Sequence, residues 1–393
     1  GLLGDNGQDL AFTMAADSDD FLTETTLQVS ADKQSYSFYN IKQRPIPSLF
    51  REFSAPVKSS FAYSREQLRF LSVSDSDGFN RWDAGQKLAL DVLDELIAAH
   101  QQAKIMQVDE MYISAFADQL KDSRTDHSML AKLITVPSIS LLAERADIID
   151  VDAILLARKT LLRELVAKTG RLLEKGYRSL SEKLASPQLA NNSSDAMGYR
   201  ACRNTCLLLL AEGDCVTVVD LARQQLREAE NMTDELGAMQ AMVSSGSDEA
   251  ASEAVNQFHD KWRQDALVMD SWFSLQAGSS SYGSLERVKR LTQHSLFSEK
   301  NPNKVRSVVG AFAGQNWQHF HKADGSGYQF LKDWVMILDN INPQIAARLV
   351  TPLTRWKKFA GQRQALMQDC LVQIKRRRNL SKDVFEVVMK SLQ

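Results

Sequence analysis

From about Ser64 to the end of the sequence, apolar residues recur at helical spacing almost without interruption. One such window, between Trp82 and His100, carries its apolar residues at Leu88, Leu90, Val92, Leu93, Leu96 and Ile97. Similar windows recur at 108–120, 138–147, 151–175, 198–212, 214–229, 249–277, 284–296, 328–340 and 361–376. Because apolar side chains at this spacing lie along one face of a helix, the chain is predicted to be mainly α.

The spacers between these windows are short and rich in Ser, Asp, Asn, Gly or Pro, as at Ser186-Pro187 and 277–281. Helices joined by short turns pack as hairpins stacked side by side. No fixed repeat length emerges, which argues against a regular tetratricopeptide or ankyrin array. The pattern therefore predicts an irregular α-solenoid of HEAT-like helix hairpins, with a concave inner face. A chain of 393 residues is also long for one compact core, so two or more domains, or an elongated array, are expected.

Residues 1–57 show a different periodicity. Residues 25–30 and 35–39 alternate polar and apolar side chains, and residues 31–34 between them favour a turn. Alternation of this kind is typical of half-buried strands in a hairpin. Because so short a β segment rarely forms a stable sheet alone, we expect the last strands of a truncated β-sandwich. The predicted domains are therefore this β segment at 1–57 and a helical domain at 58–393.

The overall composition excludes several classes of protein. The net charge is −2, without the basic excess that nucleic-acid binding along a chain requires. No apolar run reaches the roughly 20 residues that a membrane-spanning helix needs, so no membrane contact is predicted. The first residues, Gly1–Gly4, show no basic region followed by an apolar core and thus no visible signal peptide. They look like a start inside a longer protein.

The cysteines indicate a reducing compartment. Cys202, Cys206, Cys215 and Cys370 include no C-x-x-C pair. Cys202 and Cys206 are four residues apart on a helical segment, where they could share a metal. We favour the simpler interpretation, that these are small buried thiols, and therefore predict a cytoplasmic protein.

The stretch 301–350 contains the same helix start twice. Asn301-Pro302 and Asn342-Pro343 each place a capping residue directly before a proline at the first helical position. These starts carry Arg306 and Arg348 into the second turn of their helices, and Gln344 lies four residues before Arg348 on the same face. From the residues alone, each arginine is equally an ion-pair partner for a nearby acid or an exposed side chain.

Several segments carry a family resemblance that covers nearly the whole chain. They are Arg51–Val57, Asn80–Ala84, Asn231–Asp234, Leu267–Phe273 and 301–350. These segments resemble the C-terminal part of the bacterial aminopeptidase N family, which are M1 (gluzincin) zinc aminopeptidases. The resemblance implies the end of a β-sandwich followed by a superhelical α domain. It also implies partners, namely an upstream catalytic domain and peptide substrates.

The resemblance assigns a role to three side chains. Gln344 would border the pocket for the first substrate residue, while Arg306 and Arg348 would flank the residues after the scissile bond. The chain would then cover the active site and line the substrate cavity of an enzyme that removes N-terminal amino acids from peptides. A guanidinium suits this task because it can hold a carboxylate or carbonyl oxygens through paired hydrogen bonds.

The catalytic motifs of that family are missing from this sequence. A zinc peptidase of this group needs His-Glu-x-x-His on one helix, and none of the six histidines has that spacing. His319 and His321 lie only two residues apart, and the other four are isolated in the sequence. Residues 237–240 read Gly-Ala-Met-Gln, which lacks the glutamate of the family's Gly-Ala-Met-Glu-Asn motif. We therefore expect no metal or cofactor in this chain, no catalytic residue, and zinc in the parent enzyme only.

Two other functions remain open. The first is a free-standing α-solenoid that binds a protein or peptide and has no enzymatic role. The second is binding of phosphate or nucleic acid by the basic run Lys375–Arg378. That run closes a helix, where cations oppose the carbonyl end of the helix dipole, so a solvated helix end is the simpler interpretation.

Overall fold

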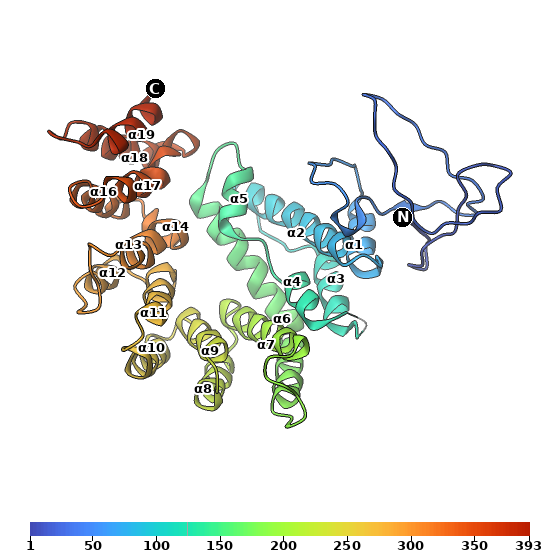
Figure 1. The fold of residues 1–393 in the computed structure, drawn as a ribbon, viewed down its shortest axis with the longest axis horizontal. Helices are drawn as coiled ribbons and strands as arrows, with labels where there is room; N and C mark the ends of the chain where they lie inside the picture. The colour runs from blue at the N-terminus through green and yellow to red at the C-terminus, as the bar shows by residue number, and fades with distance from the viewer. Residues whose placement is uncertain (124) are drawn as a thin grey trace. The chain divides into compact units, whose positions relative to one another are not determined.

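The structure is a computed structural model that describes residues 1–123 and 125–393. Helices dominate it, and one short sheet precedes them (Figure 1), which confirms the predicted mainly α class with a short β segment. The chain divides into two compact units. Unit 1 comprises residues 1–95, 107–137 and 178–202, and unit 2 comprises residues 96–106, 138–177 and 203–393. No helix in the described ranges has the length and apolar character to span a membrane.

The elements in the first half of the chain are β1 (Leu2–Leu3), β2 (Ile46–Pro47), η1 (Arg51–Phe53), α1 (Arg65–Ser74), α2 (Gly78–Gln101), α3 (Glu110–Lys121), α4 (His127–Leu133), α5 (Ile139–Arg145), α6 (Val151–Leu184) and α7 (Ser194–Glu212). The later elements are α8 (Val218–Glu228), α9 (Met232–Ser244), α10 (Asp248–Trp262), α11 (Ala266–Gly278), α12 (Leu285–Leu291), α13 (Pro302–Val305), η2 (Arg306–Gly310), α14 (Ala311–Gln315), α15 (Trp317–Phe320), α16 (Ser326–Leu338), α17 (Pro343–Thr354), η3 (Trp356–Lys358), α18 (Gly361–Lys375) and α19 (Lys382–Leu392).

The β segment of unit 1 is smaller than the sequence pattern predicts. Strands β1 and β2 pair antiparallel, with Leu3 opposite Ile46. The predicted hairpin of 25–30 and 35–39 is wrong in this structure. The chain does turn back between these segments, and the Tyr36 hydroxyl donates to the Gln28 carbonyl oxygen, but neither segment forms a strand. No residue from 25 to 39 is buried, and a hairpin without a packed face is at best marginally stable.

The helices of unit 1 start at well-formed caps and bury a small apolar core. Ser64 caps α1 by accepting from the Gln67 amide, and the Gln67 side chain accepts from the Ser64 amide in return. Helix α1 packs on α3 and buries Leu68 and Leu71. Arg81 of α2 is also buried, and its guanidinium donates to the Asp122 carboxylate at 3.0 Å. A buried charge of this kind needs such a partner.

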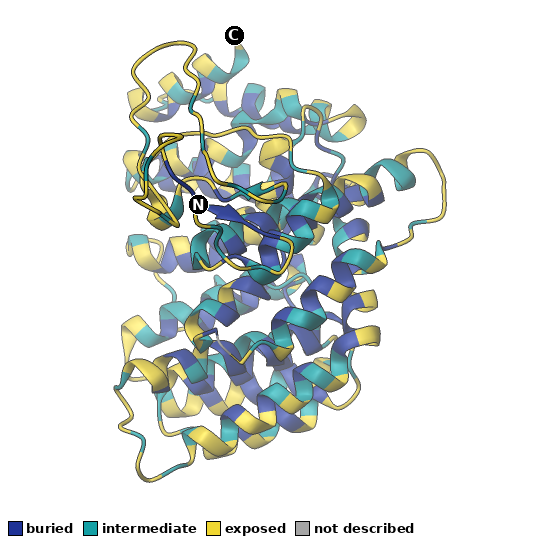
Figure 2. Ribbon diagram, turned by 90° about the vertical axis from the view of Figure 1, so that its right-hand side faces the viewer, coloured by how far each residue is buried: buried dark blue, intermediate teal, exposed yellow. Residues whose placement is uncertain are grey.

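In unit 2, helices pack mainly on their neighbours in sequence. Helix α8 packs on α9, α9 on α10, α10 on α11, and α11 on α14. The succession continues with α16 on α17, α17 on α19, and α18 on both α16 and α19. Buried residues lie on the helix sides that face neighbouring helices, whereas the connecting loops are largely exposed (Figure 2). This order of contacts is typical of stacked helix hairpins.

Unit 2 also joins its early and late segments directly. The Ile149 amide donates to the Lys358 carbonyl oxygen at 2.7 Å. The Lys358 ammonium donates to the carbonyl oxygens of Glu144, in the last turn of α5, and Ala146, its C-cap, at 3.1 and 3.0 Å. Cations favour this position because the carbonyl end of a helix is negative. Hydrogen bonds within unit 2 therefore join residues 144–149, at the end of α5 and just after it, to Lys358 of η3.

Candidate functional site

The first predicted helix start is present in the structure. The Asn301 side chain accepts from the Asn303 amide at 2.9 Å, and Pro302 occupies the first helical position of α13. Helix α13 runs directly into η2, a π-helical turn that begins at Arg306, and then into α14. A π-turn inside a helix is rare and is often found at a functional site. The Arg306 side chain is exposed.

The second helix start has the same design. The Asn342 side chain accepts from the Ile345 amide at 3.2 Å, and Pro343 begins α17. Gln344 and Arg348 are both exposed, and they share a face of α17 because they lie four residues apart. The opposite face of α17 is buried through Ala346, Leu349, Val350 and Leu353.

Neither arginine of the predicted site has an acidic partner among the described residues. The Arg306 guanidinium donates only to the side-chain oxygen of Asn303, one turn earlier. For Arg348 the described part of the chain offers no hydrogen-bond or ion-pair partner. The structure places Gln344 and Arg348 side by side on α17 and records no contact of either with Arg306. The assignment of these three side chains to substrate binding therefore stays a prediction.

The cation next to Arg306 is neutralised within the fold. Lys304 is buried, and its ammonium donates to the Asp270 carboxylate at 2.7 Å and to the Ala266 carbonyl oxygen at 2.6 Å. These bonds anchor α13 to α11. Arg306 thus keeps its charge available, while the neighbouring positive charge stabilises the helix packing.

His319 and His321, two residues apart, differ in their surroundings. The His319 ring lies 3.1 Å from the Ser280 carbonyl oxygen, whereas His321 is buried with its Nδ1 2.9 Å from the Tyr328 hydroxyl. Burial, reinforced by Arg363 and Arg355, lowers the pKa of His321 to about 3. Burial also raises the pKa of Tyr328. Both groups are therefore neutral near pH 7, and they stabilise the fold through one hydrogen bond.

Two histidines that are isolated in the sequence come together in space. The ring centroids of His259 and His294 lie 5.3 Å apart, and both rings also contact Trp272. Burial, followed by the proximity of His259, lowers the pKa of His294. The described residues contain no cluster of three or more side chains that could hold a metal ion. His259 and His294, although isolated in the sequence, therefore belong to one aromatic cluster.

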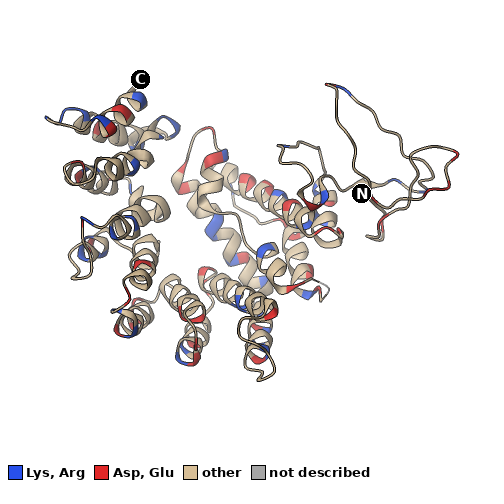
Figure 3. Cartoon of the chain, in the orientation of Figure 1, with Lys and Arg blue, Asp and Glu red and all other residues tan. Residues whose placement is uncertain are grey.

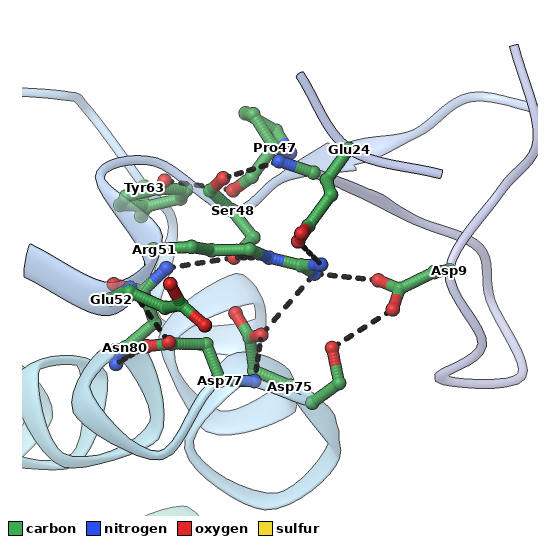
Figure 4. Close-up of polar contacts among 12 residues, drawn as sticks. Asp9, Glu24, Pro47, Ser48, Arg51, Glu52, Tyr63, Asp75, Asp77 and Asn80 are labelled. Carbon is green, nitrogen blue, oxygen red and sulfur yellow. Dashed lines mark hydrogen bonds and ion pairs between the residues drawn. The ribbon is translucent and has the colours of Figure 1, made fainter. Parts of the chain in front are cut away.

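A second polar cluster, in unit 1, centres on Arg51 (Figure 4). Its Nε donates to the Ser48 hydroxyl at 2.8 Å, and its guanidinium pairs with Asp9 at 2.5 Å and with Asp75 at 3.4 Å. Asn80 donates to the same Ser48 hydroxyl at 2.7 Å. The cluster therefore joins two of the segments that carry the family resemblance.

The carboxylates of this Arg51 cluster respond to their surroundings in opposite ways. Burial opposes ionisation of Asp9, but hydrogen bonds from Arg51 and Ser76 outweigh it and lower the pKa of Asp9. Burial dominates at Asp75 and raises the pKa of that carboxyl. The sequence offers a local signal for this cluster, since residues 74–77 read Ser-Asp-Ser-Asp directly before α2.

Comparison with known proteins defines first the class and then the family. Residues 1–62 match a family described as "Domain of unknown function (DUF3458) Ig-like fold". Residues 65–393 match one described as "Domain of unknown function (DUF3458_C) ARM repeats". The helical part is thus an α-solenoid, as the sequence predicts. The chain belongs to the DUF3458_C family.

Similar proteins include several curated bacterial aminopeptidases. Aminopeptidase N of Escherichia coli is 38% identical over 374 residues, which are 94% of this chain and 42% of the E. coli protein. Aminopeptidase N of Haemophilus influenzae is 34% identical, with 95% of this chain and 42% of the relative covered. The resemblance to the aminopeptidase N family is therefore confirmed.

A solved structure agrees with these relatives. The crystal structure of Legionella pneumophila aminopeptidase A in complex with aspartic acid matches all of this chain and 44% of its own, with a TM-score of 0.82 and 30% identity. This chain therefore spans less than half the length of each relative it matches.

Proposed function

We propose that this chain is the C-terminal, non-catalytic part of an M1 zinc aminopeptidase that removes N-terminal amino acids from peptides. The similarity to aminopeptidases N supports the family, and the sequence lacks the His-Glu-x-x-His that such an enzyme needs. In this proposal the zinc ligands and the general base lie in the remaining part of the parent polypeptide. This chain covers the active site and lines the cavity that receives peptides.

One observation carries the proposed role of the site. Arg306 and Arg348 are exposed on two helices with the same Asn-Pro start, and neither has an acidic partner among the residues described. Guanidinium groups without an acidic partner can donate paired hydrogen bonds to the carbonyl oxygens or terminal carboxylate of a peptide. Gln344, one turn before Arg348, supplies an amide that can both donate and accept at the first substrate residue.

We also propose that the parent acts in the cytoplasm. Of the four cysteines, Cys202, Cys206 and Cys370 are buried, and Cys215 is partly exposed. Buried cysteines without a disulfide spacing in the sequence are typical of proteins in a reducing compartment.

Kinetics of the complete parent enzyme test the proposal. Arg306→Ala and Arg348→Ala should each lower kcat/KM for tripeptides about tenfold, the loss expected when a charge-assisted hydrogen bond is removed. Single-residue aminoacyl amides, which do not reach beyond the scissile bond, should be affected much less. Arg378→Ala is the matched control because Arg378 is an exposed arginine near the end of α18. Equal losses on both substrate types would contradict the assignment.

The scaffold alternative predicts a different result. A parent polypeptide without aminopeptidase activity on aminoacyl-chromophore substrates, even with added zinc, would contradict the proposed function. Binding of the same peptides to this chain alone, with an affinity equal to that of the parent, would favour a free-standing peptide-binding solenoid.

A further inference from the structure

The loop between β2 and α1 exposes an unusual group of apolar side chains. We call residues 49–61 the apolar loop. Its five large apolar residues each have between 37% and 57% of their surface exposed, and they are Leu49, Phe50, Phe53, Val57 and Phe61. Exposed apolar residues are normally scattered singly over a surface, and a contiguous group indicates an interaction site.

The backbone of this loop is held in a conformation that its side chains disfavour. Phe50, Glu52 and Phe53 have φ values of 56°, 53° and 54°, in the left-handed region. Bulky L-residues rarely adopt such angles, because the Cβ atom then approaches the following carbonyl oxygen. A conformation of this kind persists only where surrounding contacts fix it.

The Arg51 cluster supplies those contacts (Figure 4). Arg51 lies in the middle of the strained segment with its side chain only 11% exposed, and it bonds to Ser48 and pairs with Asp9 and Asp75. The Glu52 amide donates to the Asp77 carboxylate at 2.9 Å, which fixes the next residue. These polar contacts therefore fix the backbone of the loop, and its phenylalanines remain exposed.

The apolar side chains are only partly packed on unit 1. Phe53 contacts Phe79 of α2 edge-on, with ring centroids 5.2 Å apart. Leu49 and Phe61 border a small cavity of about 30 Å³ that also contacts Asn80. The loop thus contacts α2 through part of its apolar surface, and the rest of that surface is exposed to solvent.

We propose that the apolar loop is the docking surface for the rest of the parent polypeptide, which carries the catalytic domain. This inference rests on the proposed function. The matched relatives are more than twice as long as the region shared with this chain, so over half of each relative lies outside it. Aromatic side chains are typical of the core of a protein interface, and the loop exposes three phenylalanines, Phe50, Phe53 and Phe61.

Thiol labelling of the parent and of this chain alone tests the proposal. Phe53→Cys and, separately, Val57→Cys are made in a Cys215→Ser background, because Cys215 is the partly exposed native thiol. The maleimide reaction at either position should be at least about tenfold slower in the parent, since an interface core excludes the reagent. Met197→Cys on α7 is the matched control, with 58% exposure in the same unit, and should react equally in both.

The outcomes separate this inference from the proposed function. Equal labelling of Phe53→Cys and Val57→Cys in parent and chain would overturn the docking surface. Slower labelling of these cysteines in the chain alone at higher protein concentration would also overturn it. A second copy of the chain would then cover the loop. Activity of the parent on an aminoacyl-chromophore substrate is measured in parallel. An active parent with an unprotected loop refutes only the docking surface, and an inactive parent with a protected loop refutes only the proposed function.

Discussion

Arg363 and Asp152 form a two-pronged ion pair within unit 2, with both N–O distances at 2.8 Å, although 211 residues separate them in sequence. Arg363 also donates from Nε to the His321 carbonyl oxygen at 2.7 Å. A bidentate arginine pair fixes the relative orientation of its two partners as well as their distance. This pair therefore orients the start of α18 against the first turn of α6.

Replacing Arg363 with Ala should destabilise unit 2. Its side chain is 17% exposed, and the substitution removes both bonds to Asp152 and leaves the His321 carbonyl without this donor. We expect the free energy of unfolding in urea to fall by about 2 kcal/mol. Arg223→Ala is the control and should cost less, because Arg223, which pairs with Glu253, is more exposed than Arg363. A loss no larger than that of the control would show that the pair contributes little.

The same pair makes stability depend on pH below neutrality. Hydrogen bonds from Arg363 lower the pKa of Asp152 below its ordinary value of 3.8. A lowered carboxyl pKa stabilises the fold fully above the unfolded-state value, and this stability is lost as the pH falls through the folded-state value. Below about pH 4, the melting temperature of the native chain should therefore fall more steeply than that of Asp152→Asn. Parallel melting curves for the two proteins would contradict this.

His321 should contribute a separate acid sensitivity at higher pH. Its folded pKa of about 3 lies below the ordinary 6.5, so the unfolded chain takes up a proton first as the pH falls. Folding stability should then decrease from about pH 6.5 downward, by at most about 1.4 kcal/mol per pH unit. His321→Gln keeps an acceptor for the Tyr328 hydroxyl but does not titrate. Denaturant unfolding at about pH 7.5 and pH 5 should show a smaller difference in this variant than in the native chain.

Two glycines should respond oppositely to substitution by alanine. A Cβ at Gly327 would lie 2.3 Å from the Phe320 carbonyl oxygen and 2.7 Å from the Phe320 Cα, and backbone atoms cannot move aside easily. Gly327→Ala should therefore lower the free energy of unfolding by about 2 kcal/mol or more. Gly314→Ala meets no atom within 4 Å in α14 and should raise stability by about 0.5–1 kcal/mol. Thermal unfolding of both variants gives the comparison, and similar losses at the two positions would contradict it.

Local signals in the sequence were sufficient to predict a mainly helical fold and two of its helix starts. The Asn301-Pro302 and Asn342-Pro343 starts cap helices as predicted, because a cap depends only on adjacent residues. The hairpin at 25–39 was predicted from alternation alone and failed, since alternation shows which face could be buried and not whether anything covers it.

Features that depend on distant residues were not predictable. The contact between His259 and His294 arises from the packing of α10 against the segment after α12. The π-turn that begins at Arg306 packs on α11, a contact that the local sequence does not reveal. The candidate site could be predicted from the sequence only in part. The helix starts locate Arg306, Gln344 and Arg348, but their spacing does not determine whether a substrate contacts them.

The bonds between residues 143–152 and 355–363 set a limit on how unit 2 can change in length. An ordinary solenoid has two free ends, so repeats can be added, and partial unfolding can begin at either end. Here the end of α5 and the start of α6 are bonded to η3 and the start of α18, so inserting or deleting a helix pair between α8 and α17 would separate groups that now lie within hydrogen-bond distance. These bonds therefore constrain the number of helices that unit 2 can hold between α8 and α17.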